Sequence, residues 1–323
     1  MIIKRVCIVD SIYALLLYFL ISTEEEIKNT FYFTGTGVPE SIRKNLPNRH
    51  SFKKQPTLLR RLFLKLSLNF FSHLRWNFLK TAKIFGQDHI QFFSTLVRNR
   101  NYTLLEDAPL VFSNFTNSHI DKQNRKLRTS WSIKIVNLLY GKIFATSFGQ
   151  NSQCENIILT KEEDLKYLPN KQTTLIDLQN IWQVSSKSKQ ELVLKLFNID
   201  LSAPIFTTKK SIIILTQPFY VDVPNFSEQE QIDLYKEIVE RYDKSEVVIK
   251  THPRDKINYC QYFLDIEIFD KPIPMQLLSI LGVRFEKAVT IFSSAVLDFP
   301  YKIKVEKIGM SCRKKIENYF ELI

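Results

Sequence analysis

Short apolar runs alternate with segments of helical periodicity along this 323-residue chain. The run at 211–215 reads Ser-Ile-Ile-Ile-Leu, and the run at 246–249 reads Glu-Val-Val-Ile. Between them, residues 227–242 open with Ser-Glu-Gln-Glu, a helix capping box, and carry apolar side chains on one helical face. A strand, a helix and a strand in this order favour a parallel sheet, because a parallel pair needs a long crossover that is usually helical. The pattern therefore predicts an α/β protein.

Further strands are predicted at similar runs, namely 5–9, 103–105, 156–159, 173–178 and 289–292. The first of these is followed by an apolar helix at 11–21, with Ser11 as its N-cap. A chain of this length exceeds most single hydrophobic cores, so two domains of about 150 residues are expected. We place them at 1–190 and 205–323, joined by the stretch 184–204, which begins rich in Ser and Lys.

Cysteine spacing and the N-terminal residues bear on the compartment. The four cysteines show no CxxC or Cys/His pattern: Cys7, Cys154, Cys260 and Cys312. We therefore expect no metal site and a reducing, cytoplasmic setting. Lys4 and Arg5 precede an apolar run as in a secretion signal, but Asp10 interrupts it, and the run is far shorter than the ~20 residues that span a bilayer.

The formal net charge of +12 is unevenly spread. Residues 41–85 contain no Asp or Glu, and their Lys and Arg residues alternate with Leu, Phe and Trp, many at helical spacing. Two interpretations stay open for this basic segment. It is either an amphipathic surface for the anionic inner face of a bacterial membrane, or a helix pair packed into the protein with a basic rim. A nucleic-acid partner is not expected, because no known nucleic-acid module accompanies the charge.

Polar residues follow several of the predicted strands, where parallel sheets bind their ligands. His252 and Arg254, beside Pro253, place an imidazole and a cation where a phosphate can bind. Ser293 and Ser294 follow the run at 289–292 and add neutral donors, expected at a helix N-terminus. The plainer interpretations are a His-Pro turn and an ordinary helix cap.

The run at 103–105 is followed by an acidic pair, Glu106 and Asp107. One of these carboxylates can take a proton from an incoming hydroxyl, although Glu-Asp before Ala-Pro is also typical of a solvated turn. Together with the imidazole and hydroxyl groups of the C-terminal half, the pair indicates group transfer from a phosphate-bearing donor.

In this order, the motifs resemble those of the bacterial sialyltransferases of glycosyltransferase family 52. The matching pieces are Leu105-Glu106-Asp107-Ala108, Leu215-Thr216-Gln217-Pro218, Lys250-Thr251-His252-Pro253-Arg254-Asp255, Ile273-Pro274-Met275-Gln276-Leu277-Leu278 and Ser293-Ser294. The resemblance extends from about 102 to 299, and the basic segment 41–85 lies outside it.

The resemblance implies a GT-B-like α/β fold, with two Rossmann-like domains facing across a cleft, and a metal-independent, inverting transfer of sialic acid from CMP-sialic acid to a galactose-type sugar of a surface glycan. It implies Asp107, or else Glu106, as general base and His252 as partner of the departing phosphate. The expected CMP-binding residues are Gln217, Lys250, Thr251, Pro253, Arg254, Gln276, Ser293 and Ser294. The sequence departs from the family at Ala108, where glycine is usual, and at Gln276, where a ribose-binding Glu is usual. The second change predicts weaker nucleotide binding, because a neutral amide replaces a charged acceptor.

Two other function classes stay open. One is a GT-B glycosyltransferase that uses a different nucleotide sugar in capsule or lipooligosaccharide synthesis. The other is a non-enzymatic binder built on the basic segment. The expected partners are CMP-sialic acid and a glycan acceptor, with no cofactor. The expected location is the cytoplasm, with the inner membrane face as an option. The sequence leaves the linkage, the acceptor and the oligomeric state open, a homodimer included.

Overall fold

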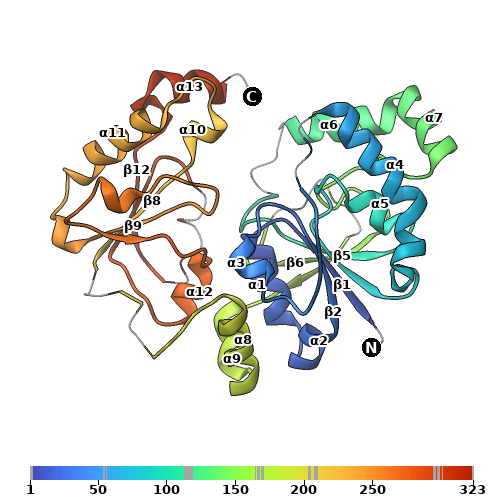
Figure 1. The fold of residues 1–323 in the computed structure, drawn as a ribbon, viewed down its shortest axis with the longest axis horizontal. Coiled ribbons are helices and arrows are strands. Elements are labelled where there is room, and N and C mark those ends of the chain that lie inside the picture. The colour runs from blue at the N-terminus through green and yellow to red at the C-terminus, as the bar shows by residue number, and fades with distance from the viewer. Residues whose placement is uncertain are drawn as a thin grey trace. The chain divides into compact units, whose positions relative to one another are not determined.

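The structure is a computed structural model of the chain, and it describes residues 3–53, 55, 57–112, 119–163, 165, 168, 171–202, 205–206, 210–293, 296, 299 and 301–321. The chain divides into two compact units, Met1–Asn198 and Ile199–Ile323. In Figure 1 the first unit runs from blue to yellow-green, and the second from yellow to red. Helix α9 (Lys187–Leu196) lies in the first unit, which therefore extends beyond residue 190.

The described strands of the first unit form a seven-stranded parallel sheet in the order β3-β2-β1-β4-β5-β6-β7. Their bounds are β1 Arg5–Val9, β2 Thr30–Thr34, β3 Asn48–Ser51, β4 Lys83–Gly86, β5 Tyr102–Leu105, β6 Cys154–Leu159 and β7 Gln172–Leu175. The chain builds outward from β1 to β3 and then returns to the other side of β1 with β4. This reversal makes the carboxyl ends of β1 and β4 a switch point, the usual ligand position of such sheets.

Helices cover both faces of this sheet (Figure 1). Their bounds are α1 Ile12–Ile21, α2 Glu24–Asn29, α3 Glu40–Arg43, α4 Leu58–Arg75, α5 Phe93–Val97, α6 His119–Thr129, α7 Trp131–Tyr140, α8 Leu178–Val184 and α9. Side chains alternate along β1, so Val6 and Ile8 join the core beneath α4 and α5, while Cys7 lies on the face covered by the aromatic residues of α1. Helix α1 begins where the sequence predicts, because the Ser11 hydroxyl accepts from the Ala14 N–H.

The second unit contains a five-stranded parallel sheet in the order β10-β9-β8-β11-β12, again for the described residues. Its strands are β8 Ile212–Leu215, β9 Val247–Lys250, β10 Glu267–Phe269, β11 Lys287–Thr290 and β12 Lys304–Lys307. Its helices are α10 Phe219–Asp222, α11 Glu228–Val239, α12 Met275–Ile280 and α13 Lys314–Glu321. The capping box predicted at the start of α11 is present, with Ser227 and Glu230 bonding each other's backbone N–H groups.

Several sequence predictions need correction. The basic segment 41–85 is not a helix pair, since it contains strands β3 and β4 around the single long helix α4 and a short 3₁₀ turn at Asn77–Lys80. The strand expected at 173–178 ends at Leu175, because Asp177 caps α8. Lys250 is the last residue of β9 and does not follow it. Strand β11 ends at Thr290, two residues before the predicted end.

Within the part of the chain that the structure describes, no helix is both long enough and apolar enough to cross a bilayer.

Candidate active site

The carboxyl ends of β1, β4, β5 and β6 lie along one edge of the first sheet, and polar side chains follow each of them. We call Asp10, Gln87, Glu106, Asp107 and Thr160 the acidic edge. Each follows its strand directly or by one residue. Glu106 and Asp107 were predicted to follow a strand, and they lie directly after β5. Since β1, β4, β5 and β6 are parallel neighbours, their carboxyl ends lie at the same edge of the sheet.

Asp107 is the more accessible acid of the pair. Its side chain is 38% exposed, and its Oδ1 accepts a hydrogen bond from the Gln87 amide. On its other side, His89 Nε2 lies 3.9 Å from Asp107 Oδ2, and the His89 ring stacks on Phe148 with ring centroids 4.8 Å apart. An accessible carboxylate that is held by a hydrogen bond at one oxygen is suited to accept a proton from a substrate hydroxyl at the other.

Glu106 has the opposite environment. It is buried, and its Oε1 accepts from the Tyr13 hydroxyl and from the Thr160 hydroxyl and N–H. Its Oε2 is also buried, with no hydrogen-bond partner among the described residues. Burial raises the pKa of Glu106 to about 7, although the bonds from Thr160 and Tyr13 oppose this. Glu106 thus ties α1 to the exit of β6, and its burial favours the protonated form of its carboxyl group.

Gln87 and Asp10 also belong to the acidic edge, and neither was predicted from the sequence as a site residue. The fully buried Gln87 amide donates to the Ser11 hydroxyl (3.1 Å) as well as to Asp107, and its Oε1 accepts from the Asp10 N–H (2.7 Å). Asp10 Oδ1 accepts in turn from the Gly37 N–H at 2.6 Å. A Cβ at Gly37 would overlap the Asp10 carbonyl oxygen, so this close approach requires glycine. The Thr-Gly-Thr-Gly sequence at 34–37 is the feature from which this close approach of two chain segments could have been predicted.

Asp88 fixes the loop that carries the stacking partner of His89. Its carboxylate accepts from the Phe148 N–H (2.6 Å), the Gly149 N–H (2.9 Å) and the Tyr102 hydroxyl (2.7 Å). Burial raises the pKa of Asp88, but these three bonds favour its charged form. The ring beside Asp107 is therefore set by a buried carboxylate one residue away.

The carboxyl ends of β8, β9 and β11 form the corresponding edge of the second sheet. We call Thr216, Gln217, His252 and Ser293 the imidazole edge. The His252 N–H donates to the Thr216 hydroxyl at 2.9 Å, and the Phe292 N–H donates to Gln217 Oε1 at 3.0 Å. Since β8 lies between β9 and β11, these two bonds join the three strand exits. The structure thus brings His252, Gln217 and Ser293 to one sheet edge.

His252 is held as a neutral ring. Burial first, and then the charge of Arg254, lower its pKa to about 4. Its Nδ1 accepts from the Arg254 N–H at 3.1 Å, so the neutral ring carries its proton on Nε2. Such an imidazole is a hydrogen-bond donor at neutral pH, which suits a phosphate oxygen that gains charge.

A buried network supports the turn that holds His252. Asp255 Oδ2 accepts from the Thr216 hydroxyl (3.3 Å), the Gln231 amide (2.9 Å) and the Tyr259 hydroxyl (2.9 Å). Gln231 is fully buried on α11, so the network links the His252 turn to the helix behind the sheet.

The two expected cations near His252 have protein partners. Arg254 forms a bidentate ion pair with Asp222 of α10, at 2.6 and 2.7 Å, and Pro253 beside it is exposed. Lys250 is buried with its Nζ 5.3 Å from the Phe269 ring centroid, and burial lowers its pKa to about 8. Both charges nevertheless lower the pKa of His252.

The remaining residues that were expected to bind CMP lie after β9, in α12 and after β11. Thr251 is buried, and its N–H donates to the Phe269 carbonyl at 3.1 Å. Gln276 is buried as the second residue of α12. The Ser293 N–H donates to the Thr290 hydroxyl at 3.0 Å, and Ser294 lies outside the described residues.

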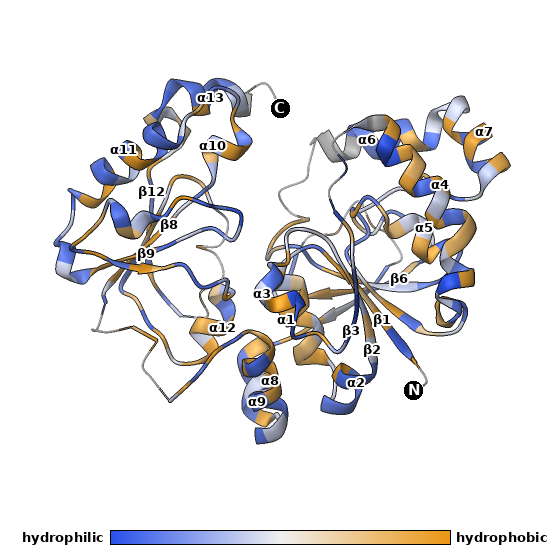
Figure 2. Ribbon diagram, in the orientation of Figure 1, coloured by the Kyte–Doolittle hydropathy of each residue, from blue (hydrophilic) through white to orange (hydrophobic). Residues whose placement is uncertain are grey.

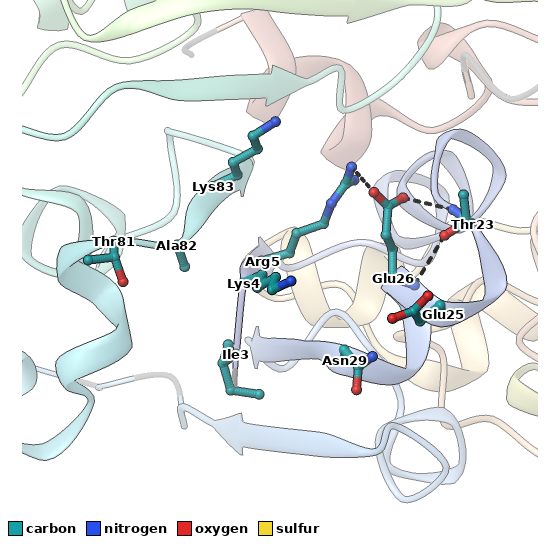
Figure 3. Close-up of a pocket in the computed structure, with 10 residues that line it drawn as sticks. All are labelled: Ile3, Lys4, Arg5, Thr23, Glu25, Glu26, Asn29, Thr81, Ala82 and Lys83. Carbon is teal, nitrogen blue, oxygen red and sulfur yellow. Dashed lines mark hydrogen bonds and ion pairs between the residues drawn. The ribbon is translucent and has the colours of Figure 1, made fainter. Parts of the chain in front are cut away.

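A pocket of about 550 Å³ lies at the opposite end of the first sheet (Figure 3). It is lined at the amino ends of β1 and β4 by residues that include Lys4, Arg5 and Lys83. The Arg5 guanidinium pairs with Glu26, which also closes the capping box of α2 with Thr23. This pocket is remote from the strand exits, and Glu26 in its wall serves the α2 cap and pairs with Arg5.

Among the described side chains, no group of three or more His, Cys, Asp or Glu residues is placed to hold a metal ion.

Comparison with known proteins agrees with this architecture. The α-2,3-sialyltransferase of Photobacterium phosphoreum, which acts on α/β-galactosides, has a similar fold with a TM-score of 0.55, 13% identity, and coverage of 98% of this chain and 95% of that chain. The GT-B domain of a sialyltransferase from Photobacterium damselae aligns with a TM-score of 0.50 and 13% identity, over 93% of this chain and 89% of that one. The predicted α/β fold of the GT-B class is thereby confirmed.

Sequence comparison gives the family. A Haemophilus influenzae protein, described only as uncharacterized, is 26% identical over 314 residues, which are 97% of this chain and 96% of the relative. The model of glycosyltransferase family 52 matches residues 40–310, and so includes the basic segment that the motif resemblance left out. Since this match spans most of its length, the chain belongs to glycosyltransferase family 52.

Proposed function

We propose that this glycosyltransferase is a sialyltransferase that moves sialic acid from CMP-sialic acid to a galactose-type hydroxyl of a bacterial surface glycan. The observation that carries the proposal is the imidazole edge, where a neutral His252 with its proton on Nε2 is bonded through its N–H to Thr216 and shares one sheet edge with Gln217 and Ser293. A nucleoside monophosphate leaving group needs aligned donors of this kind, because stabilisation of developing charge is usually the largest catalytic contribution.

In the proposed reaction the acceptor oxygen forms a bond to the anomeric carbon of sialic acid while Asp107 takes the hydroxyl proton. The bond from that carbon to the CMP phosphate oxygen breaks, and its electron pair stays on the phosphate. His252 Nε2–H donates a hydrogen bond to that oxygen, and the displacement inverts the anomeric centre. Asp107 is the better base of the acidic pair, because Glu106 is buried and already bonded to Tyr13 and Thr160.

The direct test is incubation of the full chain with CMP-sialic acid and lactose, followed by mass spectrometry of the product. We expect sialyllactose, and we expect the same yield in EDTA, because the proposed mechanism uses no metal. A thermal-shift series with CMP, UDP and GDP runs beside it. Stabilisation by UDP or GDP but not by CMP would instead support a glycosyltransferase with another nucleotide-sugar donor.

A further inference from the structure

The ion pair between Arg254 and Asp222 lies beside the ring of His252. Arg254 Nη1 lies 2.6 Å from Asp222 Oδ1, and Arg254 Nη2 lies 2.7 Å from Asp222 Oδ2. Two parallel bonds of this kind hold the guanidinium in one orientation as well as in one place. The pair therefore fixes the position of residue 254 in the turn that follows β9.

The backbone of Arg254 in turn bonds the imidazole. Its N–H donates to His252 Nδ1 at 3.1 Å, so Nδ1 is an acceptor and the neutral ring carries its proton on Nε2. The turn is closed by the Asp255 N–H, which donates to the His252 carbonyl at 2.8 Å. Within the part of the chain that the structure describes, no group accepts from Nε2. The place of residue 254 therefore determines which ring nitrogen donates to a ligand.

The helix that ends with Asp222 is anchored in the core of the second unit. Phe219 at the start of α10 is buried, and its ring packs against Phe226 and Phe292 with centroids 6.0 and 5.7 Å apart. Figure 2 shows that α10 combines hydrophobic and hydrophilic residues. Because the apolar residues hold α10 in the core, the Asp222 carboxylate is a fixed support for Arg254.

A second bond joins α10 to the same turn. The Lys256 N–H donates to the Tyr220 hydroxyl at 2.8 Å, and the Tyr220 N–H donates to Gln231 Oε1 at 3.2 Å. Residues 254 and 256 are thus both bonded to α10, whereas Asp255 between them is bonded to the buried network behind the sheet. The turn is therefore held on two sides.

The two partners of the ion pair act on the charge of His252 with opposite signs. Burial is the first cause that lowers the pKa of His252, and the charges of Arg254 and Lys250 lower it further. The charge of Asp222 raises this pKa. Loss of Asp222 should therefore lower the pKa of His252, and loss of Arg254 should raise it.

We propose that Asp222 is a positioning residue for the transfer reaction and acts on His252 through Arg254. The carboxylate holds the guanidinium, the residue-254 N–H holds the ring, and the ring keeps its Nε2 proton for the departing phosphate oxygen. This inference rests on the proposed function for what His252 donates to, but the tautomer of the ring is a property of the free chain. In this assignment the charge of Arg254 is used by Asp222.

The competing assignment is that Arg254 binds the donor anion directly. Asp222 would then occupy the guanidinium only in the free protein and would compete with the donor. Its removal would free the cation and lower the KM for CMP-sialic acid. In the proposed assignment, by contrast, removal of Asp222 lowers kcat, because His252 loses its fixed tautomer.

Nitrogen-15 NMR of the histidine rings in the full chain, without substrate, tests the tautomer. We expect the Nε2-protonated form of His252 to dominate in the unchanged chain, with His252→Gln to assign its signals, and both tautomers in Asp222→Asn. Asp222→Glu should keep the Nε2-protonated form, because it keeps a carboxylate. The matched control is Glu237→Gln, which breaks the 2.6 Å pair with Arg313 in the same unit and should change nothing.

The same spectra followed against pH separate the two partners. Arg254→Met should move the titration of His252 to higher pH, and Asp222→Asn should move it to lower pH. A role limited to holding the fold would not produce shifts of opposite sign. Circular dichroism and the unfolding temperature check that both variants fold.

Kinetics with CMP-sialic acid and lactose supply the second readout. Asp222→Asn and Arg254→Met should each lower kcat about tenfold and leave the donor KM within about twofold, because the ring loses its fixed orientation. The double variant should lose no more than the more affected single variant, since both changes remove the same pair.

Two results would overturn the proposal. The first is an unchanged tautomer of His252 in Asp222→Asn. The second is a lower donor KM in Asp222→Asn and a higher one in Arg254→Met, with kcat unchanged in both, which would assign Arg254 to donor binding. If the unchanged chain transfers no sialic acid, the proposed function fails, whereas the NMR spectra still decide whether Asp222 positions His252.

Discussion

The acidic edge and the imidazole edge occupy the same position in two sheets of the same kind, but they handle protons in opposite ways. At the acidic edge, burial raises the pKa of Glu106 to about 7, while its neighbour Asp107 stays accessible. At the imidazole edge, burial and nearby cations lower the pKa of His252 to about 4. One edge can take up a proton near neutral pH, and the other donates hydrogen bonds without becoming charged.

The difference shows that strand topology determines where polar groups lie, whereas neighbouring residues determine the pKa and the hydrogen bonding of those groups. In the first unit, Gln87 and the exit of β6 surround the acids with neutral donors. In the second, burial and the charges of Arg254 and Lys250 lower the pKa of the imidazole, although Asp222 opposes them. Substitutions that change the charge or the hydrogen bonds of one edge test this difference.

The largest expected effect comes from removing the accessible carboxylate. Asp107→Asn should lower kcat about a thousandfold, because general-base catalysis contributes about 10²–10⁴-fold. CMP affinity measured by calorimetry should stay within about twofold, since the amide keeps the shape of the site. Lost CMP affinity would place Asp107 in nucleotide binding and contradict its role as base.

Removal of the imidazole should cost about a hundredfold in kcat, because one aligned donor to a developing charge is worth about 3 kcal/mol. The change is His252→Ala, assayed with CMP-sialic acid and lactose. His252→Gln is the informative partner, since it keeps an N–H donor and should recover part of the rate. A near-normal rate for His252→Ala would refute the assignment of the imidazole edge.

Glu106 should make stability depend on pH. Its pKa rises from 4.5 to about 7 on folding, so the folded chain binds the proton more tightly. The resulting stability is present below about pH 4.5 and is lost as pH rises through 7, a change of about 3 kcal/mol. Urea unfolding at pH 5 and pH 8 should therefore show a smaller difference for Glu106→Gln than for the unchanged chain. An equal pH dependence in both would mean that another group causes it.

The smallest effect is expected at Gln87, a positioning residue for Asp107. Gln87→Met should lower kcat about tenfold with little change in KM, because Asp107 loses a fixed orientation. Gln87→Glu places a second carboxylate beside Asp107, so the acidic limb of the pH–rate profile should move to higher pH. A rate loss without that movement would show a structural role for Gln87 only.

The sequence was informative where local signals are strong. Strand β1 and the Ser11 cap of α1 were predicted at their observed bounds, and so was the Ser227 capping box, because each depends on neighbouring residues. The acidic pair and the His-Pro turn could be located because they follow apolar strands. Their roles in the reaction stay predictions.

The elements and contacts that could not be predicted from the sequence depend on residues that are distant in the chain. Strands β3 and β12 are short and read Asn-Arg-His-Ser and Lys-Val-Glu-Lys. Among the described strands they are edge strands, and they lack the apolar run that marks a central strand. The buried amide of Gln87 is hydrogen-bonded to residues 10, 11 and 107, and the spacing of these residues in the sequence does not predict the three bonds. The Arg254 pair with Asp222 likewise joins residues that are distant in the chain.

The contact of Gly37 with Asp10 has a consequence for tracing this fold among relatives. No rotation of a side chain relieves an obstruction by a backbone oxygen, so a larger residue at 37 forces a new path after β1. Glycine at 37 and the backbone path at 10 and 11 should therefore be kept or lost together among relatives. Relatives that keep this glycine should keep the whole strand exit, and those without it should have rebuilt it.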